Sequence, residues 1–201
     1  MKRQNTKIRQ EQIKRAVLDI ISSDGLSSLS TRNLAKKVGI SEGAIFRHFK
    51  TKQDIILGII QDVKTDMLGS MSAAAKENKA ADKRFFEVMC AQVRYILRNE
   101  GINILLFSEA AHYNDNILKK ELQGILAAQK KILMEIIKDG IKEGVWRKSI
   151  NVEDAATLYM GIPISLNMEL VLNRKSINTE NFCKRMFSLF SVILSKREKC
   201  L

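Results

Sequence analysis

The stretch TRNLAKKVGISEGAIFRHF, residues 31–49, decides the fold of this chain, because its apolar residues are spaced for two short helices joined by a tight turn. Gly39 predicts that turn, since it can adopt the left-handed conformation that ends a helix and that a residue with a side chain resists. Ser41 follows as a candidate N-cap for the second helix. The apolar side chains on the facing sides of the two helices are Leu34, Ala35, Val38, Ile45 and Phe49.

The second short helix turns a different set of residues outward. Its exposed face would carry Glu42, Gly43, Ala44, Arg47 and His48. A helix of this kind can lie in the major groove of DNA, with the residues of its first turn against base edges. An ordinary helical hairpin has the same spacing, so the pattern alone leaves a helix-turn-helix and a plain hairpin equally open.

The distribution of charge favours the helix-turn-helix. Residues 1–52 contain 12 Lys and Arg but only 4 Asp and Glu, a net charge of +8 out of +12 for the whole chain. Positive charge concentrated on a compact N-terminal unit is typical of proteins that bind the phosphates of nucleic acid. A soluble basic surface explains the overall charge but not its asymmetry. An anionic membrane is the alternative partner, but the first helix lacks the bulky aromatic face of an interfacial helix.

Composition limits the class of protein further. The chain has 201 residues, 45% of them hydrophobic and 28% charged, which fits a folded protein rather than a disordered one. No uninterrupted apolar run approaches the ~18 residues that span a bilayer, and the N-terminus has no apolar signal region. We therefore expect a cytoplasmic protein without membrane contact. The three cysteines are far apart, which predicts no metal site and reduced thiols at Cys90 and Cys183 that pack as small apolar residues.

Helical spacing continues through almost the whole chain, with one proline and no strand-like alternation. Thr51 and Asp54 have the spacing of a capping box at the start of a long helix. Asn151 is positioned to cap a later helix, which Pro163 should kink because it removes a backbone hydrogen bond. The expected helices cover about residues 6–22, 31–38, 41–49, 52–75, 83–98, 102–111, 116–142, 151–172 and 178–196.

The last two expected helices are apolar most of the way round, so each needs two packing partners. One partner is the rest of the subunit. The other could be the same pair of helices in a second subunit, which would form an isologous four-helix interface. A buried central position in a monomer would also explain the pattern, but a terminal hairpin in a chain of this length favours the dimer. The predicted interface residues are Tyr159, Ile162, Leu166, Phe182, Met186, Leu189, Phe190 and Ile193.

The order of these features resembles the TetR family of bacterial transcriptional regulators. A basic first helix and Gly25 are followed by four motifs in a fixed order, which makes the set far more specific than a single helix-turn-helix. The motifs are STRNLA at residues 30–35, VGIS at 38–41, GAIFRHF at 43–49 and KTKQD at 50–54. The rest of the chain resembles the family only in length, helical content and the apolar terminal pair.

The resemblance implies an all-α fold of about nine helices in two domains. Residues 1–51 would form a three-helix DNA-binding domain with a helix-turn-helix, and residues 52–201 a larger helical domain for ligand binding and dimerisation. The protein would be a ligand-responsive transcriptional regulator, usually a repressor, that binds a palindromic operator in double-stranded DNA as a homodimer. A small apolar or amphipathic effector would move the helix that begins at Lys52 and release the operator. The resemblance implies no cofactor.

The family's DNA contacts transfer residue by residue onto this sequence. Lys52 matches the lysine that binds a backbone phosphate, although an exposed lysine without a role has the same pattern. Phe46 stands where a tyrosine commonly donates to phosphate, Glu42 where a lysine is common, and Ala44 where a threonine or serine is common. These departures leave the operator sequence open. The implied DNA-binding positions are Ser30, Thr31, Arg32, Ser41, Glu42, Gly43, Ala44, Phe46, Arg47, His48 and Lys52.

A methionine-rich set of residues is the candidate lining of the effector pocket. Methionine side chains adapt to varied apolar ligands, although each residue of the set is equally well explained as plain core. The candidates are Met67, Phe86, Met89, Cys90, Val93, Phe107, Met134 and Asn167.

Two other classes of protein compete with a regulator. Glu109 and His112 are three residues apart and could form an acid-base pair, but no nucleophile, metal set or Gly-rich phosphate loop accompanies them, so we do not expect an enzyme. The second rival is a basic helical scaffold that binds acidic partners, or DNA, without recognising an operator. It predicts binding that ignores DNA sequence and disappears with salt.

Overall fold

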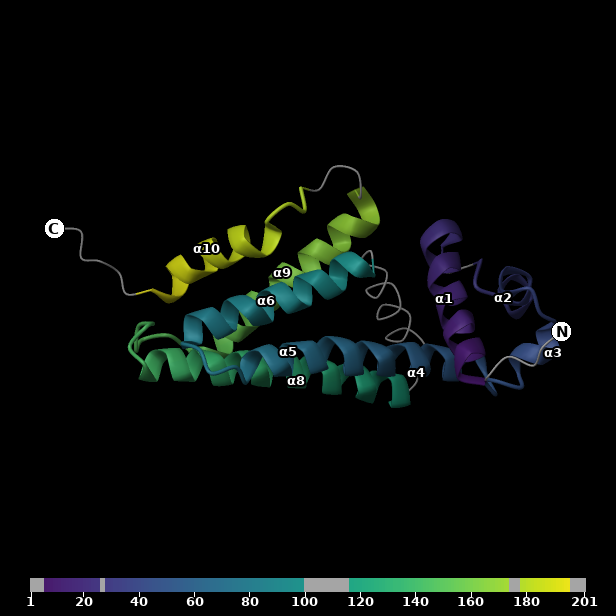
Figure 1. The fold of residues 1–201 in the computed structure, drawn as a ribbon, viewed down its shortest axis with the longest axis horizontal. Helices are drawn as coiled ribbons and strands as arrows, with labels where there is room; N and C mark the ends of the chain where they lie inside the picture. The colour runs from purple at the N-terminus through teal and green to yellow at the C-terminus, as the bar shows by residue number, and fades with distance from the viewer. Residues whose placement is uncertain (1–5, 26–27, 100–115, 174–177, 196–201) are drawn as a thin grey trace. The chain divides into compact units, whose positions relative to one another are not determined.

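The structure is a computed structural model that describes residues 6–25, 28–99, 116–173 and 178–195. Every regular element in these ranges is a helix, so the expected all-α fold is confirmed (Figure 1). The chain divides into two compact units. Of the described residues, the first unit contains those up to Val63 together with 116–121, and the second contains the rest.

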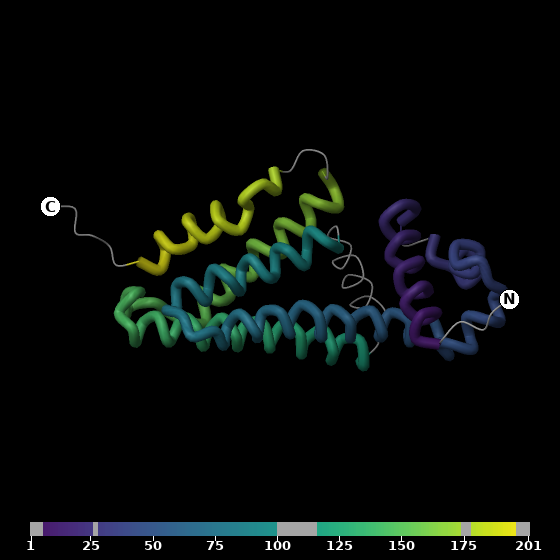
Figure 2. Tube along the Cα trace, viewed as in Figure 1, coloured from purple at the N-terminus to yellow at the C-terminus, as the bar shows by residue number. Residues whose placement is uncertain are grey.

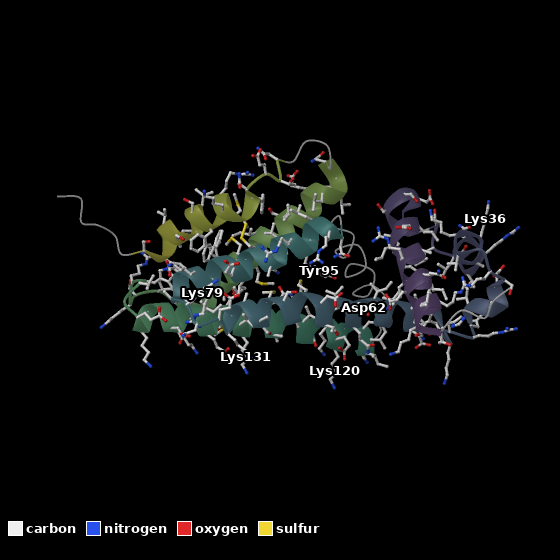
Figure 3. All side chains as sticks on the ribbon, in the orientation of Figure 1. Lys36, Asp62, Lys79, Tyr95, Lys120 and Lys131 are labelled. Atoms are coloured by element: carbon white, nitrogen blue, oxygen red, sulfur yellow. A yellow bond between two sulfur atoms is a disulfide. The ribbon has the colours of Figure 1, made fainter. Side chains whose placement is uncertain are left out.

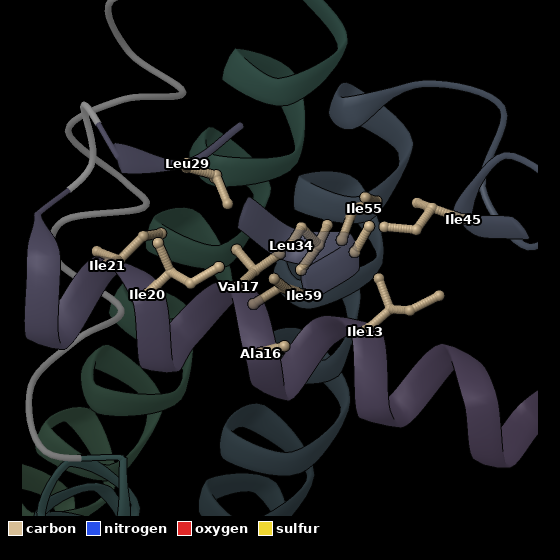
Figure 4. Close-up of a cluster of buried hydrophobic side chains, with 11 residues drawn as sticks. Ile13, Ala16, Val17, Ile20, Ile21, Leu29, Leu34, Ile45, Ile55 and Ile59 are labelled. Atoms are coloured by element: carbon tan, nitrogen blue, oxygen red, sulfur yellow. The ribbon is translucent and has the colours of Figure 1, made fainter. Parts of the chain in front are cut away.

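The first unit has a core of aliphatic side chains to which all four of its N-terminal helices contribute. These helices are α1 (Thr6–Asp24), α2 (Thr31–Val38), α3 (Glu42–Ile45) and α4 (Lys52–Val63). The core side chains converge between α1, α2 and α4 (Figure 4). Burying each isoleucine or leucine of this kind contributes about 1.5–3 kcal/mol. The most central of them are Ile13, Val17, Leu34, Ile45 and Ile55.

Polar contacts fix the position of α4 within the first unit. The predicted capping box is confirmed: the Thr51 amide donates to Asp54 Oδ2 at 2.9 Å, and the Asp54 amide donates to Thr51 Oγ1 at 3.1 Å. Lys14 of α1 is only 8% exposed and forms ion pairs with Glu11, at 2.6 Å, and with Asp62 of α4 (labelled in Figure 3). Burial opposes its charge, but the hydrogen bonds to the two carboxylates outweigh that effect and raise the pKa of Lys14.

In the second unit, α6 (Ala81–Arg98) packs most extensively against three other helices (Figure 2). These are α5 (Gly69–Ala75), α9 (Val152–Asn173) and α10 (Phe182–Leu194). Phe85 of α6 is fully buried and is the centre of an aromatic cluster. Its ring centroid lies 5.6 Å from that of Trp146, 5.3 Å from that of Tyr159 and 5.4 Å from that of Phe190. Ring pairs at such distances add to the stabilisation from burial alone.

A buried chain of polar side chains crosses this apolar core. Gln92 Nε2 donates to Gln129 Oε1 at 2.9 Å, and the Tyr159 hydroxyl donates to Gln92 Oε1 at 2.9 Å. Gln129 belongs to α8 (Asn116–Lys142), so the chain joins α6, α8 and α9. Burial raises the pKa of the Tyr159 hydroxyl, which keeps its proton and remains a donor.

Cys90 and Cys183 form a disulfide between α6 and α10, with their Cα atoms 5.2 Å apart. The expectation that these two cysteines pack as free thiols is therefore wrong. The two residues are 93 positions apart, and no local pattern in the sequence reports which segments the fold brings together.

The expected helices match the described ones closely. The expected 116–142 helix is confirmed as α8, and Asn151 caps α9 by accepting from the amides of Glu153 and Asp154 at 3.0 and 3.1 Å. Residues 52–75 are helical, as expected, but the π-helix η2 (Lys64–Leu68) lies between α4 and α5. The expected 102–111 helix lies outside the described residues.

By length and composition α9 could cross a membrane, although polar residues interrupt its apolar sequence, in agreement with the absence of a long uninterrupted apolar run. Its Tyr159, Leu166 and Leu170 are buried in the second unit. A core helix of a soluble protein has the same properties, and the packing of α9 on α6 agrees with that assignment.

Candidate nucleic-acid interface

The two ends of α2 are set by the residues on either side of it. At the start, Ser30 Oγ accepts from the Asn33 amide at 3.1 Å. At the end, Gly39 adopts the predicted left-handed conformation, with φ of 73°. The amides of Gly39 and Ile40 both donate to Ala35 O, at 2.9 and 3.0 Å, and so satisfy the last turn. The predicted turn between the two short helices is therefore confirmed.

The second helix of the motif is shorter than expected. α3 covers Glu42–Ile45, and residues 46–48 form a turn after it. Ser41 stands at the N-cap but its side chain makes no capping hydrogen bond, contrary to prediction, and its carbonyl accepts from the Ala44 amide at 2.9 Å. Ile45 is 1% exposed and anchors α3 to the core, which leaves the opposite side of α3 in solvent.

Most of the predicted DNA-binding residues are exposed on this one unit. Phe46 is 50% exposed, which is unusual for so large an aromatic ring. Thr31, Ala44, His48 and Lys52 are half-buried. The exposed members of the predicted set are Ser30, Arg32, Ser41, Glu42, Gly43, Phe46 and Arg47.

Two of the half-buried residues have structural contacts. Lys52 Nζ donates to Leu29 O at 3.0 Å and so ties the start of α4 to the segment before α2. An ammonium group has three donors, so this bond does not exhaust its capacity. His48 is less exposed than expected: its backbone carbonyl accepts from Gln10 Nε2 at 3.1 Å, and its Nδ1 is buried with no hydrogen-bond partner among the described residues.

Further lysines extend the positive charge of this surface beyond the predicted set. Lys36 and Lys37 in the last turn of α2 and Lys50 after the turn are all exposed. Glu42 is the only acidic residue between positions 28 and 50 of the sequence. In the sequence, the net charge of the region indicates that such lysines contribute to the surface, whereas the motif alone does not identify them. The arrangement suits binding to a phosphate backbone.

The predicted effector-pocket residues lie mainly inside the second unit. Met67, Met89 and Val93 are buried, Phe86 and Met134 are half-buried, and Cys90 is in the disulfide. Asn167 Nδ2 donates to Pro163 O at 2.7 Å, while its Oδ1 is buried without a partner in the described part of the chain. Phe107 lies outside the described residues, as do the rival acid-base candidates Glu109 and His112. No cluster of metal-ligating side chains occurs among the residues described.

The predicted dimer residues fall into two groups. Tyr159, Leu166 and Phe190 are at most 3% exposed, because they pack inside the second unit. Phe190 also lines a groove of about 350 Å³ between α9 and α10, as do the remaining predicted residues. The groove is lined by Leu158, Gly161, Ile162, Ser165, Phe182, Met186, Leu189, Phe190 and Ile193.

This fold and this surface define a helix-turn-helix DNA-binding transcriptional regulator. Residues 15–59, which run from α1 to α4, match the sequence profile of "Bacterial regulatory proteins, tetR family". Residues 15–59 therefore match the DNA-binding domain of this family, as the sequence motifs predicted.

Similar proteins extend the likeness over nearly the whole chain. The nucleoid occlusion factor SlmA of Vibrio cholerae is 29% identical over 184 residues, which cover 89% of this chain and 92% of that protein. A tetR-family regulatory protein from Rhodococcus RHA1 has the same fold, with a TM-score of 0.82 at 19% identity over 94% of this chain and 98% of that one. FadR of Bacillus subtilis, solved with stearoyl-CoA, has a TM-score of 0.74 at 21% identity over 90% of this chain and 97% of that one.

Proposed function

We propose that this chain is a cytoplasmic, homodimeric repressor that binds a palindromic operator through α3 and the first turn of α2. The observation that carries the proposal is the separation of roles within the helix-turn-helix. Leu34 and Ile45 hold the two helices to the core, while Arg32 and Arg47 remain in solvent. A fixed backbone with outward basic and polar side chains is what base readout requires.

The exposed residues of α3 suggest what they recognise. Arg47 can donate two hydrogen bonds to guanine or bind phosphate, and Glu42 can accept from the amino group of cytosine. Phe46 cannot donate to phosphate, but its half-exposed ring can contact a thymine methyl group. Gly43 adds no side chain, which lets the backbone of α3 approach the bases closely.

We further propose that residues 1–51 bind DNA and residues 52–201 bind the effector and the second subunit. Along the chain, the boundary between the two compact units falls between Val63 and Lys64, within the helical stretch that begins at Lys52. A helix that contributes residues to both units can carry a change in one to the other, which requires that the effector bind one conformation better than the other.

A second copy of the chain is the proposed occupant of the α9–α10 groove. Leu158, Leu172, Leu189 and Val192 are each more than half exposed, which is costly for side chains of this size on a monomer. A two-fold axis would pair α9 and α10 with the same helices of the partner and bury these residues in a four-helix interface.

For the effector we propose a small apolar or amphipathic molecule held in the second unit. Its lining would come from the predicted set of methionines and aromatics, and Asn167 Oδ1 offers a buried acceptor for a donor group of the ligand. The similarity in fold to FadR, which was solved with stearoyl-CoA, supports an effector with a long apolar part.

Nucleoid occlusion is a second candidate function. It is favoured by the identity to SlmA, which spans both units rather than the DNA-binding region alone. In this role the protein would mark DNA rather than control a neighbouring gene. Genome-wide mapping of bound sites separates the two, since a repressor occupies promoters whose transcripts rise when the gene is deleted.

Operator recognition can be tested by selecting bound fragments from genomic DNA at ~150 mM salt and measuring affinity by fluorescence anisotropy. We expect one short palindrome to be bound at least ~10³-fold more tightly than random DNA. Arg47→Ala should abolish most of this preference without altering the circular dichroism spectrum. Lys131→Ala, which removes one exposed positive charge from α8, is the matched control and should bind as the wild type does. Uniform, salt-sensitive binding to all fragments would instead support the basic scaffold.

Dimerisation can be tested by sedimentation with two variants of exposed leucines. Leu189→Glu places a charge in the α9–α10 groove and should produce monomers. Leu126→Glu changes a leucine on α8 that is 50% exposed and does not line the groove, so it should leave the dimer intact. A dimer that survives Leu189→Glu would place the interface elsewhere.

A further inference from the structure

The disulfide between Cys90 and Cys183 has surroundings that suit reversible oxidation. The sulfur–sulfur bond is visible between α6 and α10 in Figure 3. Cys90 lies in the middle of α6 and is 4% exposed, whereas Cys183 is half-buried in the first turn of α10. The two thiols are therefore unequal: an oxidant from solvent reaches Cys183 more easily than Cys90.

The environment of Cys183 also favours the reactive form of its thiol. Its place in the first turn of a 13-residue helix puts the positive end of the helix dipole beside the sulfur. Asn181, at the N-cap, makes no side-chain capping bond that would offset this positive end. The positive end of a helix stabilises a thiolate, which is the species that attacks oxidants.

The bond holds the first turn of α10, while other contacts hold the rest of the helix. Phe190 stacks on Phe85, and Leu194 O accepts from the Arg147 amide at 3.1 Å, so the second half of α10 is fixed without the disulfide. In the first half, Phe187 packs against Phe86 with ring centroids 5.2 Å apart. Cys183 precedes that contact by one turn, and its bond to Cys90 clamps the start of the helix.

The cellular location of DNA argues for a reversible bond. A tetR-family regulator must act where DNA is, and that compartment keeps thiols reduced. Disulfides that form there are usually transient and report on oxidants rather than serving as permanent cross-links. A permanent structural role is therefore the weaker explanation of this pair.

We propose that Cys90 and Cys183 form a thiol-based oxidation site, in which hydroperoxides form the disulfide and dithiols reduce it. The Cys183 thiolate attacks a hydroperoxide, the O–O bond breaks, and the products are a sulfenic acid at Cys183 and an alcohol or water. The Cys90 sulfur then attacks the sulfenic sulfur, which forms the S–S bond and releases water. The two thiols lose two electrons and two protons, and the hydroperoxide gains them. A dithiol reverses the reaction by exchange and becomes a cyclic disulfide itself.

The consequence for DNA binding rests on the proposed function. Phe182 and Met186, on either side of Cys183 in the sequence, line the α9–α10 groove that we assign to the second subunit. Forming the disulfide fixes this wall of the groove. It should therefore stabilise the dimer and raise its affinity for a two-fold operator. Opening it should loosen the first turn of α10 and weaken both.

The oxidation site is tested in the full chain with Cys200→Ser, which removes the third thiol. After reduction with dithiothreitol and its removal, hydrogen peroxide is titrated in, free thiols are alkylated, and the protein is analysed by mass spectrometry. We expect both thiols to disappear together, a cross-linked pair of peptides containing Cys90 and Cys183, and full recovery with dithiothreitol. Persistent free thiols, over-oxidised cysteine or cross-links between chains alone would overturn the proposal.

Two further variants, each also carrying Cys200→Ser, test the consequences of the bond. Oxidation should raise the Tm by roughly 5–15 °C and slow amide exchange in the first turn of α10, and Cys183→Ser should remove both effects. Cys90→Ser should do the same, with circular dichroism confirming that each variant folds. Equal exchange in oxidised and reduced protein would disprove the clamp. If the disulfide forms but operator affinity is unchanged, the link to DNA binding is wrong; if no operator is bound in either state, the proposed function fails and the oxidation site stands.

Discussion

Different kinds of contact stabilise the interiors of the two units of this protein. In the first unit, aliphatic residues of four consecutive helices form the core, and Ser30, Gly39 and the Thr51–Asp54 box end or begin those helices locally. In the second unit, Phe85 gathers aromatic rings from distant segments, and Cys90 is bonded 93 positions away. The difference teaches that a binding surface built on local signals can be located from sequence, whereas one built on long-range contacts cannot.

Substitutions in the core of each unit should have the largest effect on the free energy of unfolding. Phe85→Ala should lower the free energy of unfolding by about 3–5 kcal/mol, and Ile45→Ala by about 2–5 kcal/mol, because both side chains are fully buried. Trp146 is the single tryptophan of the chain and contacts Phe85, so its fluorescence reports on the second unit. Urea unfolding followed by fluorescence and by circular dichroism measures both variants.

Separate units predict separate effects in that experiment. Phe85→Ala should shift the fluorescence transition, while Ile45→Ala should shift the circular dichroism transition and abolish operator binding but leave fluorescence nearly unchanged. If both variants shift both signals equally, the chain unfolds as one cooperative body and the comparison of two units applies to contacts but not to stability.

The ion pair of Lys14 should give an intermediate effect with a defined pH dependence. Asp62→Asn should cost about 1–3 kcal/mol, because Lys14 is buried and loses its partner on α4. The folded-state pKa of Lys14 is raised above its ordinary 10.5, so its contribution is complete below pH 10.5 and is lost as the pH rises through the folded value. Unfolding by urea at pH ~8 and pH ~11 should show this loss in the wild type and a smaller one in Asp62→Asn.

Tyr159 requires a control in this experiment, since burial raises its pKa too and weakens the second unit in the same alkaline range. Tyr159→Phe removes that contribution, so the double variant with Asp62→Asn should lose the least stability between the two pH values. An unchanged pH dependence in Asp62→Asn would mean that the ion pair does not stabilise α1 against α4.

The sequence predicts those parts of the structure that depend on neighbouring residues. The left-handed turn at Gly39 and the box at Thr51 and Asp54 each involve residues within four positions of one another, and both are confirmed, whereas the predicted cap at Ser41 is not. The outward face of α3 follows from Ile45 alone, since one anchored residue fixes the orientation of a single helical turn.

The contacts that the sequence does not reveal join residues far apart in the chain. Lys52 looks like an exposed phosphate ligand, but its Nζ also reaches Leu29 O, 23 positions away. Tyr159 lies on an apolar stripe that predicts an interface, yet its hydroxyl bonds to Gln92, 67 positions away in the core. Period and composition show that a helix face is apolar, but not whether its own subunit or another covers it.

Substitutions at two glycines, one in each unit, should give the smallest changes in stability. The two positions differ in backbone conformation and in little else. A Cβ added at Gly39 or at Gly124 would meet no atom within 4 Å, but Gly39 has a φ of 73° and Gly124 lies within α8. Gly39→Ala should therefore destabilise the first unit by about 1–2 kcal/mol. Gly124→Ala should stabilise the second by about 0.5–1 kcal/mol, because alanine favours the helix.

Thermal unfolding of the two single variants and the double variant checks these signs, and the two effects should add because the sites share no partner. Operator affinity adds a second criterion. If the turn at Gly39 sets the orientation of α3, Gly39→Ala weakens operator binding at a temperature where the variant remains fully folded, and Gly124→Ala does not. Equal operator affinity in both folded variants would show that Ile45, rather than the turn, positions α3 on DNA.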